Sequence, residues 1–303
     1  MTTAMPAKLS VVIPSYQSQA HLRRTLEALV EQLEQCDAEI IVVDCSPGTE
    51  VDDICDAFNA VQLIKCQQRF NPGSGRNIGA DAASGEALVF IDADVVMQAG
   101  ALSAIARRVA AGNDIFGGAL ELAPGDYRTF ASYIEHYFFN HEAQASRQAG
   151  TRPNLSSAMM IVRRDLFIEI GGFSDIPRMQ DTEMTERLVA KGYQLGFFPE
   201  IVGFQVQDSS LSKVFKKIFI NGNNLYFLRY QQAKGLGYKI LLGFTLPLLM
   251  MAKVTRINFR NMKYAGSAFM LLALCPFMYL CGSAWMFGFY KGLLISNGIA
   301  AGR

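Results

Sequence analysis

Short apolar runs alternate with segments of helical spacing along the first two hundred residues. The runs at 9–13, 40–43, 61–64 and 87–91 predict four buried strands. Between the first two runs, apolar residues recur on one helix face, at Leu22, Leu26, Leu29, Val30 and Leu33. Strands that alternate with helices predict an α/β fold, with a mostly parallel sheet that has right-handed crossovers and helices on both faces.

The same alternation continues as far as residue 200. Residues 158–162 predict a further strand, and residues 164–170 and 182–191 predict helices that stop at Gly171 and Gly192. We expect the sheet to end near Phe198 and Pro199.

The pattern changes after residue 211. Lysines and apolar residues interleave from Ser212 to Phe219, which predicts a basic amphipathic helix that could lie on a membrane surface. Residues 240–252 form an uncharged run that is short for a span and contains Pro247, whereas the uncharged run 264–290 is long enough to cross a bilayer. The linker between the two runs carries four basic residues, Lys253, Arg256, Arg260 and Lys263.

The positive-inside rule keeps that linker cytoplasmic. Residues 240–252 are then an interfacial or re-entrant helix, and residues 264–290 are the single crossing. A two-span hairpin, a bent or re-entrant insertion around Pro276, and a buried helix pair in a soluble protein are the alternatives.

Charge divides the chain in the same place. Residues 1–200 carry 16 basic and 26 acidic side chains, whereas residues 201–303 carry 12 basic side chains and a single acidic one, Asp208. Basic charge among long apolar runs favours membrane lipids over nucleic acid as the partner. We therefore predict a catalytic domain at 1–210, basic interfacial helices at 211–263, and a transmembrane or re-entrant anchor with a short tail at 264–303.

The composition excludes several classes of protein, and the N-terminal residues indicate the side of the membrane on which the catalytic domain lies. Half of the residues are hydrophobic, which excludes a disordered, collagenous or disulfide-scaffold chain. The six cysteines lie at no metal-ligand spacing, so we expect reduced thiols. The first residues lack the features of a secretory signal, so we expect the catalytic domain on the cytoplasmic side of the cell inner membrane.

Polar residues that could carry chemistry follow the predicted strands. In open α/β sheets ligands bind beyond the carboxyl ends of the strands, where 14–16, Asp44 and 92–94 are expected to converge. Asp92 and Asp94 could share a hard divalent cation with phosphate oxygens. The alternative for this pair is two solvated turn carboxylates or a helix cap.

The segment 71–79, Asn-Pro-Gly-Ser-Gly-Arg-Asn-Ile-Gly, opens a predicted helix. Backbone amides at a helix start and the Arg76 guanidinium suit a diphosphate. The glycine spacing and the position after the third strand disfavour a nicotinamide dinucleotide.

Four motifs in this order resemble the family 2 glycosyltransferases of the GT-A fold. They are Val11-Val12-Ile13-Pro14-Ser15-Tyr16, Ile40-Ile41-Val42-Val43-Asp44, Gly75-Arg76-Asn77-Ile78-Gly79 and Phe90-Ile91-Asp92-Ala93-Asp94. The likeness continues to Phe198-Pro199-Glu200, about two thirds of the chain. It implies a nucleotide-sugar donor, Mg²⁺ or Mn²⁺, and inversion at the anomeric carbon.

The resemblance also implies roles for individual residues. Pro14 and Tyr16 would line the base pocket, Asp44 would contact the nucleoside, and Arg76 would approach the diphosphate. Asp92 would bind the ribose or sugar side, and Asp94 would hold the metal.

The general base implied by the resemblance is Asp181, with Glu183 as a substitute. The structural alternative for Asp181 is an N-cap of a helix that starts at Thr182. Three positions depart from the family pattern, Cys45, Gln180 and Gln205. Neither glutamine can supply a charge, which implies a metal held less tightly, or a base tuned less finely, than in typical relatives. The chain has no Gln-x-x-Arg-Trp motif, which favours transfer of one sugar at a time over processive synthesis.

Aromatic residues and two histidines cluster at 133–141, where related enzymes place acceptor contacts, although core packing is the commoner role of such a face. From the motif order and the charge asymmetry, we predict a hexosyltransferase with a lipid or lipid-linked saccharide as acceptor, in cell envelope polysaccharide or glycolipid biosynthesis. The alternatives are a polyprenyl-phosphate sugar synthase and a catalytically silent, membrane-tethered scaffold or binding protein.

Overall fold

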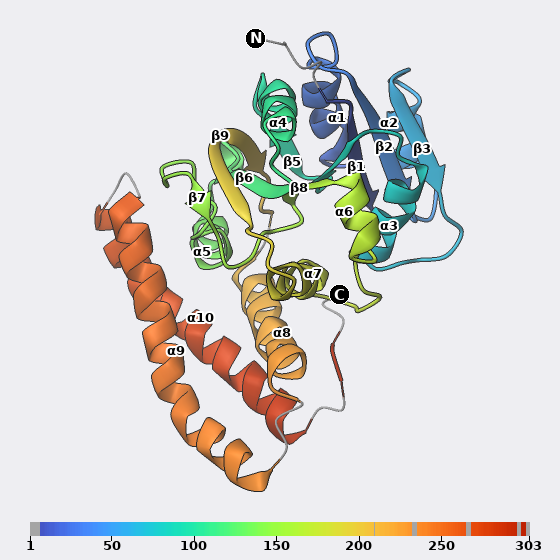
Figure 1. Cartoon of the computed structure of the whole chain (residues 1–303). Helices are drawn as coiled ribbons and strands as arrows, with labels where there is room; N and C mark the ends of the chain where they lie inside the picture. The colour runs from blue at the N-terminus through green and yellow to red at the C-terminus, as the bar shows by residue number, and fades with distance from the viewer. Residues whose placement is uncertain (1–6, 209, 232–234, 265–267, 296–297, 301–303) are drawn as a thin grey trace. The chain divides into compact units, whose positions relative to one another are not determined.

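The computed structural model describes residues 7–208, 210–231, 235–264, 268–295 and 298–300 (Figure 1). The chain divides into two compact units. Unit 1 takes in residues up to 123 together with 143–175 and 180–206, and unit 2 takes in 124–142, 176–179 and the residues from 207 onward.

Unit 1 is built on one sheet, whose strand order is β3-β2-β1-β4-β8-β6-β9-β5, with β7 paired to β9. The strands are β1 (Leu9–Ser15), β2 (Ala38–Asp44), β3 (Val61–Lys65), β4 (Ala87–Ile91), β5 (Val95–Met97), β6 (Ile115–Leu122), β7 (Gly150–Thr151), β8 (Met159–Arg163) and β9 (Gly196–Gln205). The expected α/β fold is therefore confirmed.

The parallel arrangement that the sequence predicts holds from β3 to β4, and the rest of the sheet is mixed. Strand β8 runs antiparallel to both β4 and β6, and β5 runs antiparallel to β9. Only residues 92–94 separate β4 from β5, and a parallel crossover needs about a dozen residues or more. Strand β5 is therefore no parallel neighbour of β4, and it pairs with β9 at the end of the strand order.

Helices cover both faces of this sheet. They are α1 (Leu22–Val30), α2 (Glu50–Cys55), α3 (Pro72–Ala82), α4 (Ala101–Ala110), α6 (Arg164–Glu169) and α7 (Gln180–Ala190). One core lies between the sheet and α1, α2 and α4, and alternate residues of the same strands form a second core with α3, α6 and α7. Because successive strand residues point to opposite faces, Val11 lies in the first core and Val12 in the second.

The sheet does not end at Pro199. Strand β9 continues to Gln205, and its parallel register with β6 shifts between Gly118 and Ala119, so that Phe198 and Val202 face consecutive residues of β6. Proline cannot donate a ladder hydrogen bond, and an irregularity of this kind accommodates it inside a strand. The prediction that the sheet ends near Phe198 and Pro199 was therefore wrong.

Unit 2 is helical. Its elements are the 3₁₀ turn Gly125–Tyr127, α5 (Phe130–Phe139), α8 (Leu211–Arg229), α9 (Leu236–Tyr264) and α10 (Ala268–Leu294). The expected interfacial helix at 240–252 and the basic linker form one continuous helix, α9. Its buried positions recur at helical spacing across both segments, at Leu242, Leu246, Met250, Val254 and Ile257, while Pro247 is exposed.

Two of these helices are candidate membrane spans. Residues Leu236–Met262 of α9 and Met270–Leu294 of α10 are long and apolar enough to cross a bilayer by length and composition. The division of the chain at 210 and 263 remains a prediction.

Candidate active site

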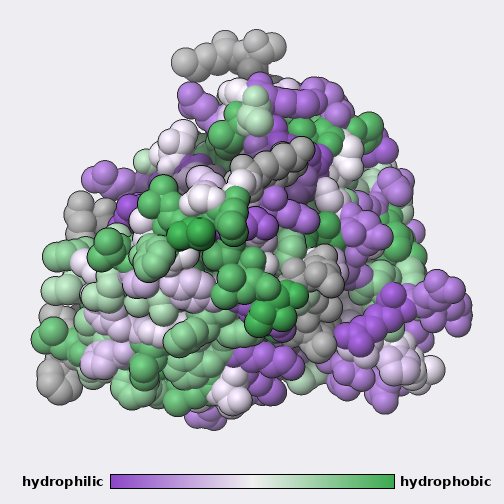
Figure 2. All heavy atoms as spheres, turned by 90° about the horizontal axis from the view of Figure 1, so that it is seen from below, coloured by the Kyte–Doolittle hydropathy of each residue, from purple (hydrophilic) through white to green (hydrophobic). Residues whose placement is uncertain are grey.

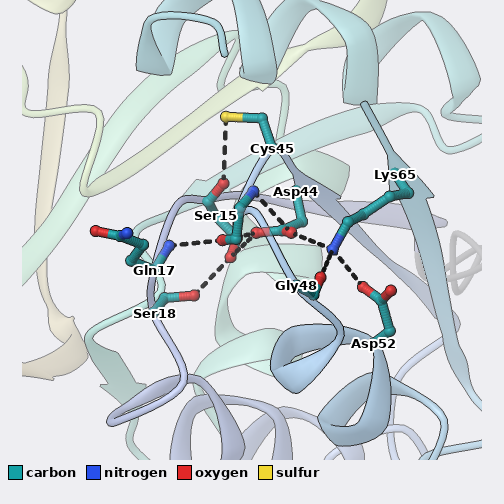
Figure 3. Close-up of polar contacts among 9 residues, drawn as sticks. Ser15, Gln17, Ser18, Asp44, Cys45, Gly48, Asp52 and Lys65 are labelled. Carbon is teal, nitrogen blue, oxygen red and sulfur yellow. Dashed lines mark hydrogen bonds and ion pairs between the residues drawn. The ribbon is translucent and has the colours of Figure 1, made fainter. Parts of the chain in front are cut away.

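Asp44 is completely buried at the end of β2 and is bound on all sides (Figure 3). Its Oδ1 accepts hydrogen bonds from the hydroxyls of Ser15 and Ser46, each at 2.7 Å. Its Oδ2 accepts one from the backbone N–H of Ser46 at 3.0 Å and lies 3.0 Å from the Nζ of Lys65. These contacts fix the carboxylate at the carboxyl ends of β1, β2 and β3.

Lys65 completes this arrangement from β3. Its ammonium also donates to Asp52 at 2.6 Å and to the carbonyl of Gly48 at 2.8 Å, as Figure 3 shows. Partial burial opposes the charge, but the hydrogen bonds to Asp52 and Asp44 raise the pKa of Lys65 above its ordinary value. The lysine therefore stays charged across the physiological range.

Pro14 and Tyr16 lie beside this network at the end of β1. Both are half-buried, and the guanidinium of Arg69 lies 4.3 Å from the centre of the Tyr16 ring. Gln17 adopts a left-handed conformation with φ of 53°, and its N–H donates to the Ser46 hydroxyl at 2.6 Å. The turn after β1 is thereby joined to the end of β2.

The start of α3 is built from the glycine-rich segment. The Asn71 side chain caps the helix by accepting from the N–H of Ser74 at 2.9 Å, and Pro72 occupies the first helical position. Gly75 leaves room for the Phe70 ring, since a Cβ there would lie 2.4 Å from a ring carbon. The first turn of α3 can therefore pack against the loop that precedes it.

Arg76 links this helix to the exit of β4. Its guanidinium is buried, forms an ion pair with Asp92, and lies 5.6 Å from the ring centre of Phe173. Its Nε is buried and has no hydrogen-bond partner among the residues that the structure describes. An anion at this point would find a buried guanidinium with one donor still to satisfy.

Asp94 is the last residue of the segment between β4 and β5. Its Oδ1 is 3.5 Å from the Nε2 of Gln205, the last residue of β9, and Val206 donates its N–H to the Asp94 carbonyl. Asp92 and Asp94 thus contact different partners. Gln205, which departs from the family pattern, is placed beside the carboxylate that the resemblance assigns to the metal.

The described residues contain no group of three or more His, Cys, Asp or Glu suited to a metal ion. Mg²⁺ is commonly bound by one or two carboxylates together with substrate phosphates and water. Asp94 is half-buried and follows Asp92, the ion-pair partner of the buried Arg76, by two residues. Such a carboxylate fits a metal that arrives with a diphosphate.

Asp181 lies in the first turn of α7, because the helix begins at Gln180 and not at Thr182. Asp181 is thus the second residue of the helix, and the alternative that it caps a helix starting at Thr182 was wrong. Its Oδ1 accepts from the N–H of Thr182 at 2.7 Å and its Oδ2 from the N–H of Ser157 at 3.3 Å. The N-terminus of α7 and the segment before β8 hold this carboxylate.

The neighbours of Asp181 have structural contacts of their own. Gln180 is buried and donates to the Asn71 side chain at 3.2 Å, which connects α7 with the start of α3. Glu183 accepts from Ser174 at 2.6 Å and from Arg187 at 2.7 Å. Glu183 is thus bound to the segment before α7.

The aromatic cluster at 133–141 belongs to unit 2. Tyr137 and Phe138 are part of its buried core, and the rings of Tyr133 and Tyr137 stack with centres 6.2 Å apart. Burial, with a contribution from Arg128, lowers the pKa of His136 to about 4. Packing accounts for this cluster within the unit.

Of the partners that fix the site, the sequence motifs include only Ser15. Ser15, Ser46 and Lys65 surround Asp44, and Ser157 binds Asp181. Lys65 carried a signal, since it ends the third predicted strand as Asp44 ends the second, and the two residues pair in the parallel register.

Several glycosyltransferases are similar to this chain. "Probable glycosyltransferase YdaM" of Bacillus subtilis is 27% identical over 74% of the chain and 57% of its own length. "Glycosyltransferase GlyG" of Streptococcus pneumoniae is 24% identical over 60% of the chain and 65% of its own length. The chain thus spans less than two thirds of these two relatives.

A third relative carries an acceptor in its name. "GalNAc(5)-diNAcBac-PP-undecaprenol beta-1,3-glucosyltransferase" of Campylobacter jejuni is 29% identical over 37% of the chain and 38% of its own length.

Solved structures share the fold. The mannosyltransferase PcManGT from Pyrobaculum calidifontis, in complex with GDP-Man and Mn²⁺, matches with a TM-score of 0.64 at 16% identity, over 96% of this chain and 88% of that one. Staphylococcus aureus TarS 1-349 in complex with UDP-GlcNAc matches with a TM-score of 0.54 at 15% identity, over 94% of this chain and 90% of that one.

The family model described as "Glycosyl transferase family 2" matches residues 10–171, more than half of the chain, which include Asp44, Arg76, Asp92 and Asp94. The predicted resemblance is therefore confirmed, and the chain belongs to glycosyl transferase family 2.

Proposed function

We propose that the chain transfers one sugar, with inversion, from a nucleotide sugar to a hydroxyl or phosphate oxygen of a lipid or lipid-linked acceptor at the cytoplasmic face of a membrane. The observation that carries the proposal is the ion pair between Arg76 and Asp92. It connects the amide-rich start of α3 with the strand exit that bears Asp94.

The donor would lie along the carboxyl ends of β1, β2 and β4. Pro14 and Tyr16 would flank the base, and Asp44 would act on the nucleoside, with its contacts to Ser15 and Ser46 holding that wall in place. Arg76 would bind the diphosphate through its unsatisfied Nε side, and Asp92 would face the ribose or sugar.

Asp94 would hold Mg²⁺ or Mn²⁺ together with the donor's phosphate oxygens. A bound divalent ion offsets the charge that develops on the nucleoside diphosphate leaving group. Gln205 beside Asp94 would orient that carboxylate through its side-chain amide.

Asp181 would act as the general base. In a single displacement, an acceptor oxygen attacks the anomeric carbon and the bond from that carbon to the phosphate oxygen breaks. When the acceptor is a hydroxyl, its proton moves to Asp181. The hydrogen bonds from Thr182 and Ser157 leave a half-buried carboxylate oriented by backbone amides.

The acceptor is proposed from two observations. The Campylobacter jejuni relative is named for an undecaprenol-linked acceptor, and the chain has two helices apolar enough to enter a membrane. Attachment beside the bilayer raises the local concentration of such acceptors.

The test is thermal stabilisation followed by transfer. Purified chain is heated with a panel of nucleoside diphosphates and nucleotide sugars, each with Mn²⁺, Mg²⁺ or a chelator, because a ligand of the folded state raises the apparent stability. The donor that stabilises is then incubated with extracted membrane lipids. The anomeric configuration of the product is compared with that of the donor.

We expect one nucleotide class to stabilise the wild type in a metal-dependent way. With a donor that carries a labelled sugar, the labelled product should become extractable into organic solvent, and its anomeric configuration should be inverted. In Asp94→Asn the metal-dependent part should disappear. Stabilisation without any transfer would support the silent scaffold, and labelled product in the aqueous phase alone would exclude a lipid acceptor.

A further inference from the structure

Helices α9 and α10 run antiparallel, side by side along most of their length. The Asn258 amide lies 3.3 Å from the Cys275 sulfur, and the hydroxyls of Thr255 and Tyr279 are 2.8 Å apart. At the other end, the Tyr290 hydroxyl donates to the carbonyl of Gly243 at 2.7 Å. The two helices form one hairpin-like pair within unit 2.

One face of each helix is apolar and exposed. On α9 these residues recur at intervals of three or four, at Leu236, Ile240, Phe244, Leu248 and Met251. Phe244 is 80% exposed and Leu248 73% exposed. On α10 the exposed apolar residues recur at intervals of seven or eight, at Leu272, Leu280, Phe287 and Leu294. We call these two sets the outer faces of α9 and α10.

The opposite side of α10 is covered by α8. A Cβ on Gly222 would lie 1.9 Å from the Trp285 carbonyl oxygen, and one on Gly288 would lie 1.8 Å from that of Phe219, so the two backbones touch at this crossing. Helix α8 is polar near this point. Lys216 is exposed, six residues before the crossing glycine, and Asn221 accepts from Arg178 at 2.6 Å.

These contacts conflict with a bilayer crossing by either helix. A span needs about 20 residues, and any stretch of that length includes Trp285 in α10 and Lys253 in α9. The Lys253 ammonium lies 4.1 Å from the centre of the Trp285 ring. If either helix spanned the bilayer, Lys253 and the contact between α8 and α10 would therefore lie at the depth of the hydrocarbon. Lys216, on α8, would be close to that depth, where charge is costly.

The exposed charges of α9 and α10 are basic. Lys239 and Arg256 of α9 and Lys291 of α10 are exposed, and residues 201–303 contain a single acidic side chain. Figure 2 shows apolar side chains spread over much of the face seen from below, with polar side chains beside them. An apolar face with a basic surround suits the surface of a membrane that contains anionic lipid.

We propose that α9 and α10 lie in the plane of one leaflet, with their outer faces in the lipid and α8 on the water side, and that neither helix crosses the bilayer. This arrangement refines the membrane attachment of the proposed function and is independent of the sugar transferred. It replaces the single crossing at 264–290 that the sequence predicts.

The first test is binding to vesicles. Purified chain is sedimented with vesicles of phosphatidylcholine alone and of phosphatidylcholine with phosphatidylglycerol. Phe244→Asp/Leu248→Asp changes the outer face of α9, and Ile168→Asp, at an exposed apolar residue of α6, is the matched control. Thermal stabilisation by the donor verifies that each variant is folded. Because this measurement does not depend on vesicles, it distinguishes a failure of donor binding from a failure of membrane binding.

We expect the wild type and the Ile168 variant to bind the anionic vesicles at least tenfold better than the double variant, with weaker binding to phosphatidylcholine alone. Equal binding of all three proteins would overturn the proposal. A second result would also overturn it: the wild type is a dimer, and the double variant is a monomer that binds vesicles as well as the wild type does. A second copy of the chain would then cover the outer face.

The second test is topology. An epitope is placed between α9 and α10 in one variant and at the C-terminus in another, and its accessibility is measured in sealed membrane vesicles of either orientation. Both epitopes should lie on the side of the catalytic unit. A single crossing would move the C-terminal epitope to the other side, and a two-span hairpin would move the epitope between the helices, so either result would refute an in-plane arrangement.

Discussion

The Nζ of Lys65 lies 3.0 Å from the Oδ2 of Asp44, at positions that pair in the parallel register of β3 and β2. Asp44 is fully buried, whereas the Lys65 side chain remains 27% exposed. The carboxylate therefore depends on the lysine for charge compensation and on Ser15 and Ser46 for hydrogen bonds, and this dependence can be tested.

We expect Asp44→Asn to destabilise the protein by about 1–3 kcal/mol, because an amide N–H would face the donors of Ser46 or Lys65 in a buried place. Asp52→Asn removes the partly exposed partner of the same lysine and should cost less than about 1 kcal/mol. Chemical denaturation measures both. Equal losses would mean that the buried carboxylate is no more dependent on its partners than the exposed one.

Arg76 and Asp92 should behave as a coupled pair. In a double-mutant cycle with Arg76→Gln and Asp92→Asn, the coupling free energy should be about 1 kcal/mol or more, because one partner is buried. The exposed pair of Arg163 and Asp165 provides the control and should couple weakly. Additive effects of the two substitutions would mean that the ion pair contributes nothing to stability beyond its separate residues.

Asp181→Asn should lower kcat of sugar transfer by about 10²–10⁴-fold, the usual contribution of a general base, while the donor affinity stays the same. Glu183→Gln, two residues further along α7, should lower stability through its lost contacts with Ser174 and Arg187 and leave transfer nearly intact. Steady-state kinetics and donor titration measure the two effects. The reverse pattern would assign the base to Glu183.

Helix packing in unit 2 should tolerate a methyl group only where there is space. Gly288→Ala meets the Phe219 backbone and should destabilise the helices by about 1–3 kcal/mol. Gly243→Ala, on α9, has its nearest atoms at 3.7 and 3.9 Å and should be neutral or slightly stabilising. Melting temperatures in detergent compare them, and a neutral Gly288 variant would contradict the close approach of α8 and α10.

Glu39 provides a pH dependence. Partial burial opposes its charge, but hydrogen bonds from Ser10 and Ser84 lower the pKa of this carboxyl. Stabilisation by the carboxylate is thus present above the ordinary value of about 4.3 and is lost as the pH falls through the lower pKa of the folded state. The stability difference between the wild type and Glu39→Gln should shrink as the pH falls below that value, and a constant difference from neutral pH to about pH 3 would exclude a role for the charge.

The sequence predicts the strands well where polar residues mark their ends. Strand β4 occupies 87–91, as predicted, because an uninterrupted apolar run lies between the charged residues Glu86 and Asp92. The start of α3 was also predictable, since Asn71 and Pro72 are a capping residue and a first-turn proline.

Other features depend on pairing and backbone conformation that a local pattern does not contain. Strand β9 passes through Pro199 because its register with β6 shifts there. Helix α7 begins at Gln180 because Met179 takes a left-handed conformation, with φ of 67°, directly before it. Helix α9 continues past Ala252 because its buried face keeps the helical period, whereas the prediction followed the length of the uncharged run.

Strand β9 also determines when unit 1 can be completed during synthesis. It is the last strand of the sheet to be made. Among the strands that the structure describes, β5 pairs with β9 alone, and β9 covers one edge of β6. A nascent chain that has not yet exposed residues 196–205 outside the ribosome carries these unpaired edges, which are sites for wrong pairing and for chaperone binding. The Asp94 side of the proposed donor site therefore forms only after about two thirds of the chain has been translated.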